Sequence, residues 1–264
     1  MTAIPLGPAE LAGAASLVLI NGLLSVWLGL DLHKRLAIAS VRTVVQLLLL
    51  GLILTPVFRW SSPWAVVGLC AVMVTLAAWE STRRSSRLYR GILASTFAAM
   101  LVGAGGTAIV ATVALVGADP WYDPRYMIPF VGMVLGNALT GVTLGLDRCL
   151  TSLDKLRSQV EIRLAWGATW WEAARPITSD AVKTGMIPII NSMSVVGLIT
   201  IPGMTTGQLL GGASPEQAVR YQILILFVIA AATGLGTVIA VLMSVRALFD
   251  RDHRLRPERI RLRP

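Results

Sequence analysis

Seven stretches of the sequence contain no Asp, Glu, Lys, Arg or His and approach the length that crosses a bilayer as a helix. A hydrocarbon core about 30 Å thick needs roughly 20 apolar helical residues, whereas a membrane β-barrel alternates polar and apolar positions. We therefore predict an all-α, polytopic integral membrane protein with about seven transmembrane helices. The predicted spans are Leu11–Leu30, Thr43–Phe58, Pro63–Trp79, Gly91–Ala118, Tyr126–Leu146, Met186–Pro202 and Tyr221–Val245.

The positions of the basic residues test this count, because cytoplasmic loops of membrane proteins are enriched in Lys and Arg. We assigned the segments between the predicted spans alternately to two sides. Only three of the 23 Lys and Arg residues then fall on one side, namely Arg59, Arg125 and Arg220. This separation predicts a multi-pass plasma-membrane protein with its N-terminus outside and its C-terminus in the cytoplasm.

Composition excludes an ordinary soluble domain. The 264 residues are 55% hydrophobic and only 14% charged, whereas soluble domains carry about 25% charged residues. The net charge of +9 marks the cytoplasmic side rather than a nucleic-acid partner. We expect one permease domain over residues 1–250, followed by a basic cytoplasmic tail at 251–264. Because no aromatic residue interleaves the arginines of that tail, we expect it to contact membrane lipid and no nucleic acid.

The segment between the fifth and sixth predicted spans, residues 147–185, is about 40 residues long, and long ordered loops are commonly functional. Apolar residues recur there every three or four positions, which predicts an amphipathic cytoplasmic helix. These residues are Leu153, Leu156, Val160, Leu164, Ala168 and Trp171. Thr169 and Glu172 have the spacing of a capping box, which predicts a second short helix from about Trp170. A helix–turn–helix that projects from the membrane is one interpretation, and a helix lying on lipid is the other.

The spacing in this segment resembles the cytoplasmic coupling loop of ABC-transporter permeases. Glu161 precedes Gly167 by six positions, and Gly167 precedes Ile177 by ten. Two departures are Ile162-Arg163 in place of two alanines and Ser179-Asp180 in place of Leu-Pro. The resemblance implies that the following residues couple the chain to an ATPase subunit: Glu161, Gly167, Ala168, Glu172 and Ile177.

Further short matches along most of the chain resemble the iron-export permease family of ABC transporters, which is also similar to plant permeases linked to aluminium tolerance. The matching pieces are Val41–Leu47, Ala77–Trp79, Ile128–Met133, Gly136–Ala138, Val196–Leu198, Pro202–Met204 and Arg220–Ile223. The resemblance implies a permease subunit that exports iron or a related metal species, works as a homodimer and depends on a partner ATPase for ATP and Mg. The sequence contains no GxxxxGK[ST] motif, and we expect this chain to bind no cofactor itself.

Small residues at GxxxG spacing offer surfaces on which helices can approach closely. Gly132 with Gly136, and Gly141 with Gly145, both lie in the fifth predicted span. They fit either a contact between two permease chains or packing within one chain.

The apolar cores contain no ionisable side chain, which argues against a proton-coupled antiporter. The remaining candidates for the transport pathway are Arg42, Gln46, Met133, Asn137, Asn191, Ser192, Pro202, Gly203 and Met204. Arg42 also fits a snorkelling anchor, and the asparagines fit hydrogen bonds between helices. The helix-poor stretch 203–219 is either a re-entrant gate or a surface turn.

Hard oxygen ligands for a metal substrate occur only at the rims of the predicted spans. On the outer side these are Asp119, Asp123 and Glu216. An enzyme is disfavoured because the cores lack paired acids, HExxH or a Ser/His set. The competing class is an ATP-independent channel or secondary carrier for a small solute.

Overall fold

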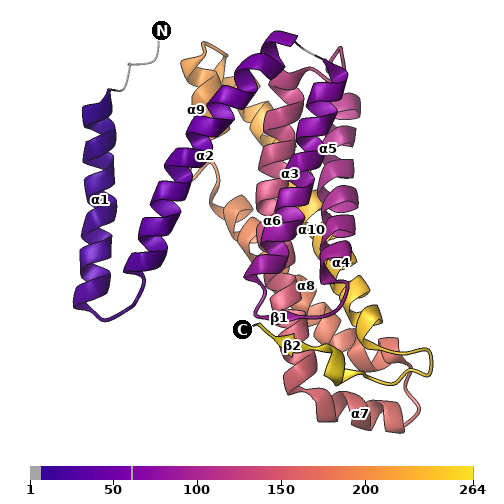
Figure 1. Cartoon of the computed structure of the whole chain (residues 1–264). Coiled ribbons are helices and arrows are strands. Elements are labelled where there is room, and N and C mark those ends of the chain that lie inside the picture. The colour runs from indigo at the N-terminus through magenta and orange to yellow at the C-terminus, as the bar shows by residue number, and fades with distance from the viewer. Residues whose placement is uncertain (1–6, 61, 264) are drawn as a thin grey trace. The chain divides into compact units, whose positions relative to one another are not determined.

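The computed structural model describes residues 7–60 and 62–263, and the chain divides into two compact units. Within the described residues, the first unit contains residues 7–60 together with 210–212. The second contains 62–209 and 213–263. Both are built from helices (Figure 1), so the predicted all-α fold is confirmed.

The first unit is a pair of helices, α1 (Pro8–Trp27) and α2 (His33–Trp60). A short turn joins them, in which the Ser25 hydroxyl accepts a hydrogen bond from the backbone N–H of Leu32 at 2.9 Å. Most apolar side chains of both helices are exposed. In a membrane, lipid or protein must cover these surfaces, as the hydropathy predicts.

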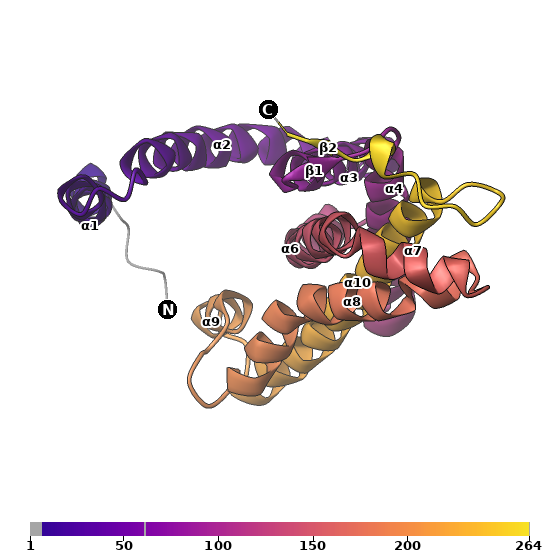
Figure 2. The same cartoon turned by 90° about the horizontal axis from the view of Figure 1, so that it is seen from below.

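The second unit is a helical bundle in which α6 contacts α3, α8 and α10 (Figure 2). The run from Ile92 to Val116 is helical throughout, with π-helical turns at Met100–Gly106 and Ala111–Val116. The bundle helices are α3 (Pro63–Arg84), α4 (Ile92–Ala99), η1 (Met100–Gly106), α5 (Thr107–Val110), η2 (Ala111–Val116), α6 (Pro124–Lys155), α8 (Trp170–Val195) and α10 (Pro215–Leu248).

Among the described residues, six helices are long and apolar enough to cross a membrane. They correspond to six of the seven predicted spans, and a multi-pass membrane protein is confirmed. The predicted sixth span, Met186–Pro202, differs from the structure at both ends. The helix that contains residues 186–195 of it begins at Trp170 and ends at Val195, and Arg175, Asp180 and Lys183 make the first half of this helix polar.

Glycines let three helices of the bundle cross closely. A Cβ atom at Gly141 would lie 2.4 Å from Thr233 Cγ2, and one at Gly185 would lie 2.6 Å from the Gly141 carbonyl oxygen. A Cβ at Gly145 would lie 2.6 Å from Thr237 Cγ2. The Gly141/Gly145 pair therefore packs within the chain, joining α6 to α8 and α10. By contrast, a Cβ at Gly136 would meet no atom within 4 Å.

The segment predicted as a helix–turn–helix is helical, but its boundaries differ from the prediction. Helix α6 continues through Asp147 to Lys155, the chain bends at Leu156, and α7 covers Arg157–Ala165. The second helix, predicted to be short, is the first part of α8, which has 26 residues. The second helix of the predicted helix–turn–helix and residues 186–195 of the predicted sixth span are therefore one continuous helix.

The glycines after α8 predicted a stretch with little helix, and this prediction is wrong. Helix α9 covers Gly203–Leu210, and α10 begins at Pro215 after a Ser214 cap. The buried Thr205 hydroxyl donates a hydrogen bond of 3.0 Å to Gln222 Oε1 on α10. This contact holds the helix against the bundle despite its composition.

The C-terminal segment folds back onto the bundle. Strand β2 (Arg261–Leu262) pairs with β1 (Arg87–Leu88), which lies in the connection between α3 and α4. A short turn η3 (Pro257–Arg259) precedes it. In Figure 1, these elements and α7 lie at one end of the second unit, and α9 lies toward the other.

Candidate functional site

Helices α7 and α8 meet in a sharp turn, which we call the knuckle (residues 157–173). Gly167, at the turn, has φ +89°, and a Cβ atom there would meet nothing within 4 Å. The glycine is therefore required by backbone conformation and not by lack of space. This positive φ lets the chain leave α7 and enter α8 within four residues.

The capping box at the start of α8 is confirmed. The Glu172 carboxylate accepts hydrogen bonds of 2.8 Å from both the backbone N–H and the hydroxyl of Thr169. The Thr169 hydroxyl in turn accepts from the backbone N–H of Glu172 at 3.3 Å. The backbone hydrogen bond from Thr169, with its hydroxyl second, lowers the pKa of Glu172. The predicted coupling residue Glu172 thus fixes the local geometry of the knuckle.

An apolar core lies beneath the knuckle. Leu153, Val160, Ala173 and Ile177 are buried in one cluster, and Leu164 and Ala168 pack against it. This confirms most of the predicted apolar stripe, although Leu153 belongs to α6, and Leu156 and Trp171 are 37% and 39% exposed. Two predicted coupling residues, Ala168 and Ile177, therefore support the knuckle from below.

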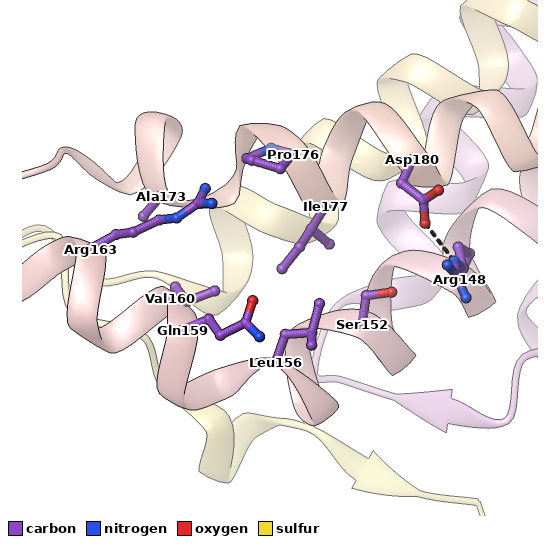
Figure 3. Close-up of a pocket in the computed structure, with 10 residues that line it drawn as sticks. All are labelled: Arg148, Ser152, Leu156, Gln159, Val160, Arg163, Ala173, Pro176, Ile177 and Asp180. Carbon is purple, nitrogen blue, oxygen red and sulfur yellow. Dashed lines mark hydrogen bonds and ion pairs between the residues drawn. The ribbon is translucent and has the colours of Figure 1, made fainter.

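A pocket of about 190 Å³ opens between α6, α7 and α8 (Figure 3). At one side of it, the Arg148 guanidinium donates to the Asp180 carboxylate at 2.6 Å. Both side chains are about half exposed, so the pair contributes little to stability. The pair does connect the polar half of α8 to α6. Asp180 lies where the coupling-loop pattern has Leu-Pro and this chain has Ser179-Asp180.

The outer surface of the knuckle carries exposed apolar side chains. Trp166 is 86% exposed, and Ile162, one helical turn earlier, is 51% exposed. Beside them, Glu161 forms an exposed ion pair of 2.7 Å with Arg157. A large exposed aromatic residue with charged neighbours is typical of a surface that binds another protein.

The C-terminal segment holds the start of α8. The Trp170 ring lies 6.3 Å from the Phe249 ring, and the Arg246 guanidinium lies 5.7 Å from the Trp170 ring centroid. The backbone N–H of Trp170 donates to His253 Nδ1 at 3.3 Å. Leu255 is buried in the same cluster as Val160. The tail is thus part of the support of the knuckle.

Two of the predicted pathway residues meet near the other end of the second unit. Met133 of α6 and Met204 of α9 line one pocket of about 290 Å³. Sequence reasoning missed several other residues that line it: Arg125, Tyr126, Gln208 and Tyr221. The Gln208 Oε1 atom is buried without a hydrogen-bond partner among the described residues. Tyr221 lies in the matching piece Arg220–Ile223, but the sequence of that piece does not indicate which helix the Tyr221 side chain faces.

The other pathway candidates of the second unit, Asn137, Asn191, Ser192, Pro202 and Gly203, are not among the residues that line this pocket. The Asn137 amide donates to the Met133 carbonyl of its own helix at 2.9 Å, so the predicted hydrogen bond between helices is not the one found. Asn191 and Ser192 are exposed on α8. Pro202 and Gly203 lie at the start of α9. Arg42 and Gln46 lie one turn apart on α2, in the first unit.

Two of the three acidic residues predicted at the outer rim have structural partners. Asp123 caps α6 by accepting from the backbone N–H of Arg125 at 2.9 Å, and Glu216 pairs with Arg220 at 2.6 Å. Asp119 precedes Pro120 in the connection to α6. Within the described parts of the chain, no group of three or more His, Cys, Asp or Glu could hold a metal ion. A rim site for a metal substrate stays a prediction.

The helices and their apolar surfaces define an all-α, multi-pass integral membrane protein. Residues 8–249 match the family described as "Uncharacterised protein family (UPF0014)", and the chain belongs to this family. No solved structure gives a significant match.

Three relatives extend over most of the chain. UPF0014 membrane protein slr1647 of Synechocystis is 34% identical and covers 87% of this chain and 88% of the relative. The protein named "Probable iron export permease protein FetB" of Escherichia coli is 29% identical, with 93% of each chain covered. Protein ALUMINUM SENSITIVE 3 of Arabidopsis thaliana is 27% identical, with 94% of this chain and 90% of the relative covered.

Proposed function

We propose that this chain is the membrane-spanning permease subunit of an ABC transporter that exports iron or a related metal species. A separate ATPase subunit binds ATP and Mg and supplies the energy. Family membership and the name of the Escherichia coli relative support the substrate class. The observation that carries the coupling role is the knuckle, whose tip leaves Trp166 and Ile162 largely exposed among the residues that the structure describes.

In this proposal, the tip of the knuckle enters a cleft of the ATPase. Trp166 and Ile162 supply apolar contact, since both are largely exposed. Glu161 and Arg157 supply charged contact beside them. Gly167 and the Thr169/Glu172 cap set the angle between α7 and α8. Movement of the ATPase is then passed to α8.

The knuckle end of the second unit faces the cytoplasm, in accordance with the distribution of Lys and Arg in the sequence. The pocket between α6, α9 and α10 then faces the outside, where an exported species leaves. Thioethers of Met133 and Met204 and the amide of Gln208 line that pocket. Two permease chains form the membrane part of the transporter, and the exposed Gly136 face of α6 is available for their contact.

The test is co-purification of the tagged chain with an ABC ATPase encoded beside it, followed by native mass spectrometry. We expect two permeases and two ATPases, and iron flux in proteoliposomes only when ATP is present. Trp166→Ala should weaken ATPase binding about 30-fold, as for loss of a binding hot spot of about 2 kcal/mol. The matched control is Trp64→Ala, since Trp64 is 83% exposed at the start of α3.

Two results would contradict the proposal. Equal ATPase binding by Trp166→Ala and Trp64→Ala would remove the coupling role from the knuckle. Flux that needs no nucleotide, from a chain that purifies alone, would favour the channel or secondary carrier.

A further inference from the structure

We propose that the C-terminal tail and the α3–α4 connection form a binding site for the phosphate headgroup of an anionic membrane lipid. The two segments enclose a basic pocket of about 680 Å³. The pocket is lined by Leu88, Tyr89, Arg90, Ala247, Glu258, Arg259 and Arg261. The site is independent of the proposed transport activity.

Backbone pairing brings the arginines together from positions far apart in the sequence. In the β1–β2 ladder, Leu88 lies opposite Arg261, so both side chains point to the same face. The backbone N–H of Arg263 donates to the Ser86 carbonyl at 3.0 Å and fastens the end of the ladder. Arg259 Nη1 donates to the Ala247 carbonyl at 2.7 Å, which fixes the middle of the tail against α10.

The charge of the pocket is positive and partly uncompensated. The carboxylate in its lining, Glu258, lies 3.8 Å from Arg256, outside the lining. In the described part of the chain, the guanidinium groups of Arg90 and Arg261 have no hydrogen bond or ion pair. Neighbouring basic residues do have partners, such as Arg87 with Asp154 at 2.9 Å. Arg90 and Arg261 are therefore the groups available to an anion.

The position and walls of the pocket favour a lipid over a free anion. Ala247 is one residue from the end of α10, and Arg90 is two residues before α4 begins, so the pocket lies at the ends of two predicted spans. Leu88 and the ring of Tyr89 provide apolar walls, and the Tyr89 hydroxyl is already bonded to Ser244 at 3.0 Å. Arginine groups at the cytoplasmic interface bind lipid phosphates through charge-assisted hydrogen bonds, and aliphatic walls suit the glycerol and upper acyl chain.

The experiment measures binding of short-chain phosphatidylglycerol to the purified full chain in zwitterionic detergent, by native mass spectrometry and by titration. Phosphatidylcholine and inorganic phosphate are titrated in parallel. The pocket variant is Arg90→Gln with Arg261→Gln. The control variant, Arg251→Gln with Arg254→Gln, removes the same charge from tail residues outside the pocket. Thermal unfolding of both variants checks that they fold, and Arg90→Gln alone replaces the double variant if that one does not.

We expect saturable binding of phosphatidylglycerol but not of phosphatidylcholine, about tenfold weaker in the pocket variant and unchanged in the control. Equal weakening in both variants would overturn the site in favour of general attraction to the basic surface. Inorganic phosphate binding as tightly as the lipid would overturn the lipid as occupant. Absence of saturable binding would overturn the proposal as a whole.

Discussion

Replacement of Gly145 by alanine tests whether close helix crossing limits the stability of the bundle. A Cβ atom there would lie 2.6 Å from Thr237 Cγ2, whereas ordinary van der Waals contact begins at 3.4 Å. The next nearest atom is the Ala181 carbonyl oxygen at 3.3 Å. A single methyl group of α10 is therefore the main obstacle.

The expected change in the free energy of unfolding for Gly145→Ala is the sum of two opposing effects. Overpacking of a core costs about 1–3 kcal/mol, and this contact is short enough for the upper part of that range. Alanine in place of glycine in a helix regains about 1 kcal/mol. We expect Gly145→Ala to lower the free energy of unfolding by about 1–2 kcal/mol, or roughly 2–8 °C in Tm. In a Thr237→Ser background the obstructing methyl is gone, and Gly145→Ala should be neutral or stabilising.

The assay is thermal unfolding in detergent of the two single variants and the double variant, which gives the coupling energy directly. The control is Gly68→Ala, because a Cβ at that exposed position on α3 meets nothing within 4 Å. It should be neutral or slightly stabilising. If Gly145→Ala destabilised the wild-type protein and the Thr237→Ser variant equally, the steric argument would be refuted.

Four further predictions concern the knuckle and the tail. Gly167→Ala should cost about 1–2 kcal/mol through its positive φ, and Gly167→Asn should cost less, as read by hydrogen exchange over residues 157–173; equal costs would argue against a backbone effect. Thr169→Ala should cost about 1 kcal/mol and reduce protection of the first turn of α8. The pKa of Glu172 is lowered, so its capping of α8 is fully present above the ordinary glutamate pKa and is lost as pH falls through the lowered value. The hydrogen-exchange protection of the first turn of α8 in the wild-type protein should therefore fall over the same pH range. Asp250 accepts from the backbone N–H groups of Arg254 and Asp252 and pairs with Arg256 at 2.8 Å; Asp250→Asn should speed tryptic cleavage within residues 251–263, and an unchanged rate would contradict a role in holding the tail.

The apolar runs predicted six membrane helices well, because a bilayer demands long uncharged stretches whatever the tertiary structure. They did not predict where helices end. Helix α6 continues to Lys155 and α3 to Arg84, beyond the apolar runs of the sequence. Backbone hydrogen bonding can continue a helix into the aqueous phase, where no apolar run is needed. For the same reason the sequence did not predict that α8 is one continuous helix. Asp180 and Lys183 interrupt the apolar pattern but not the helix.

Local signals predicted local geometry at the candidate site. The Thr169/Glu172 spacing and the glycine between two helices both correspond to features of the knuckle. Contacts between distant segments could not be predicted in this way. The pairing of β1 with β2 involves two residues from each strand, which is too short to leave a pattern. Likewise, the meeting of Met133 with Met204 depends on the packing of α9.

The continuity of α8 has a mechanical consequence. Its 26 residues correspond to a rod about 39 Å long, and no loop interrupts it between the capped first turn and Val195. At Gly185 the helix crosses α6 so closely to the Gly141 backbone that it cannot slide. A tilt imposed at the cap therefore rotates α8 about this crossing, which acts as the fulcrum. The far arm must swing in the opposite sense, carrying the connection to α9 with it. Pro176, between the cap and the fulcrum, and Pro188, just beyond it, each lack an N–H to bond the preceding turn, so the helix bends most easily at these two positions.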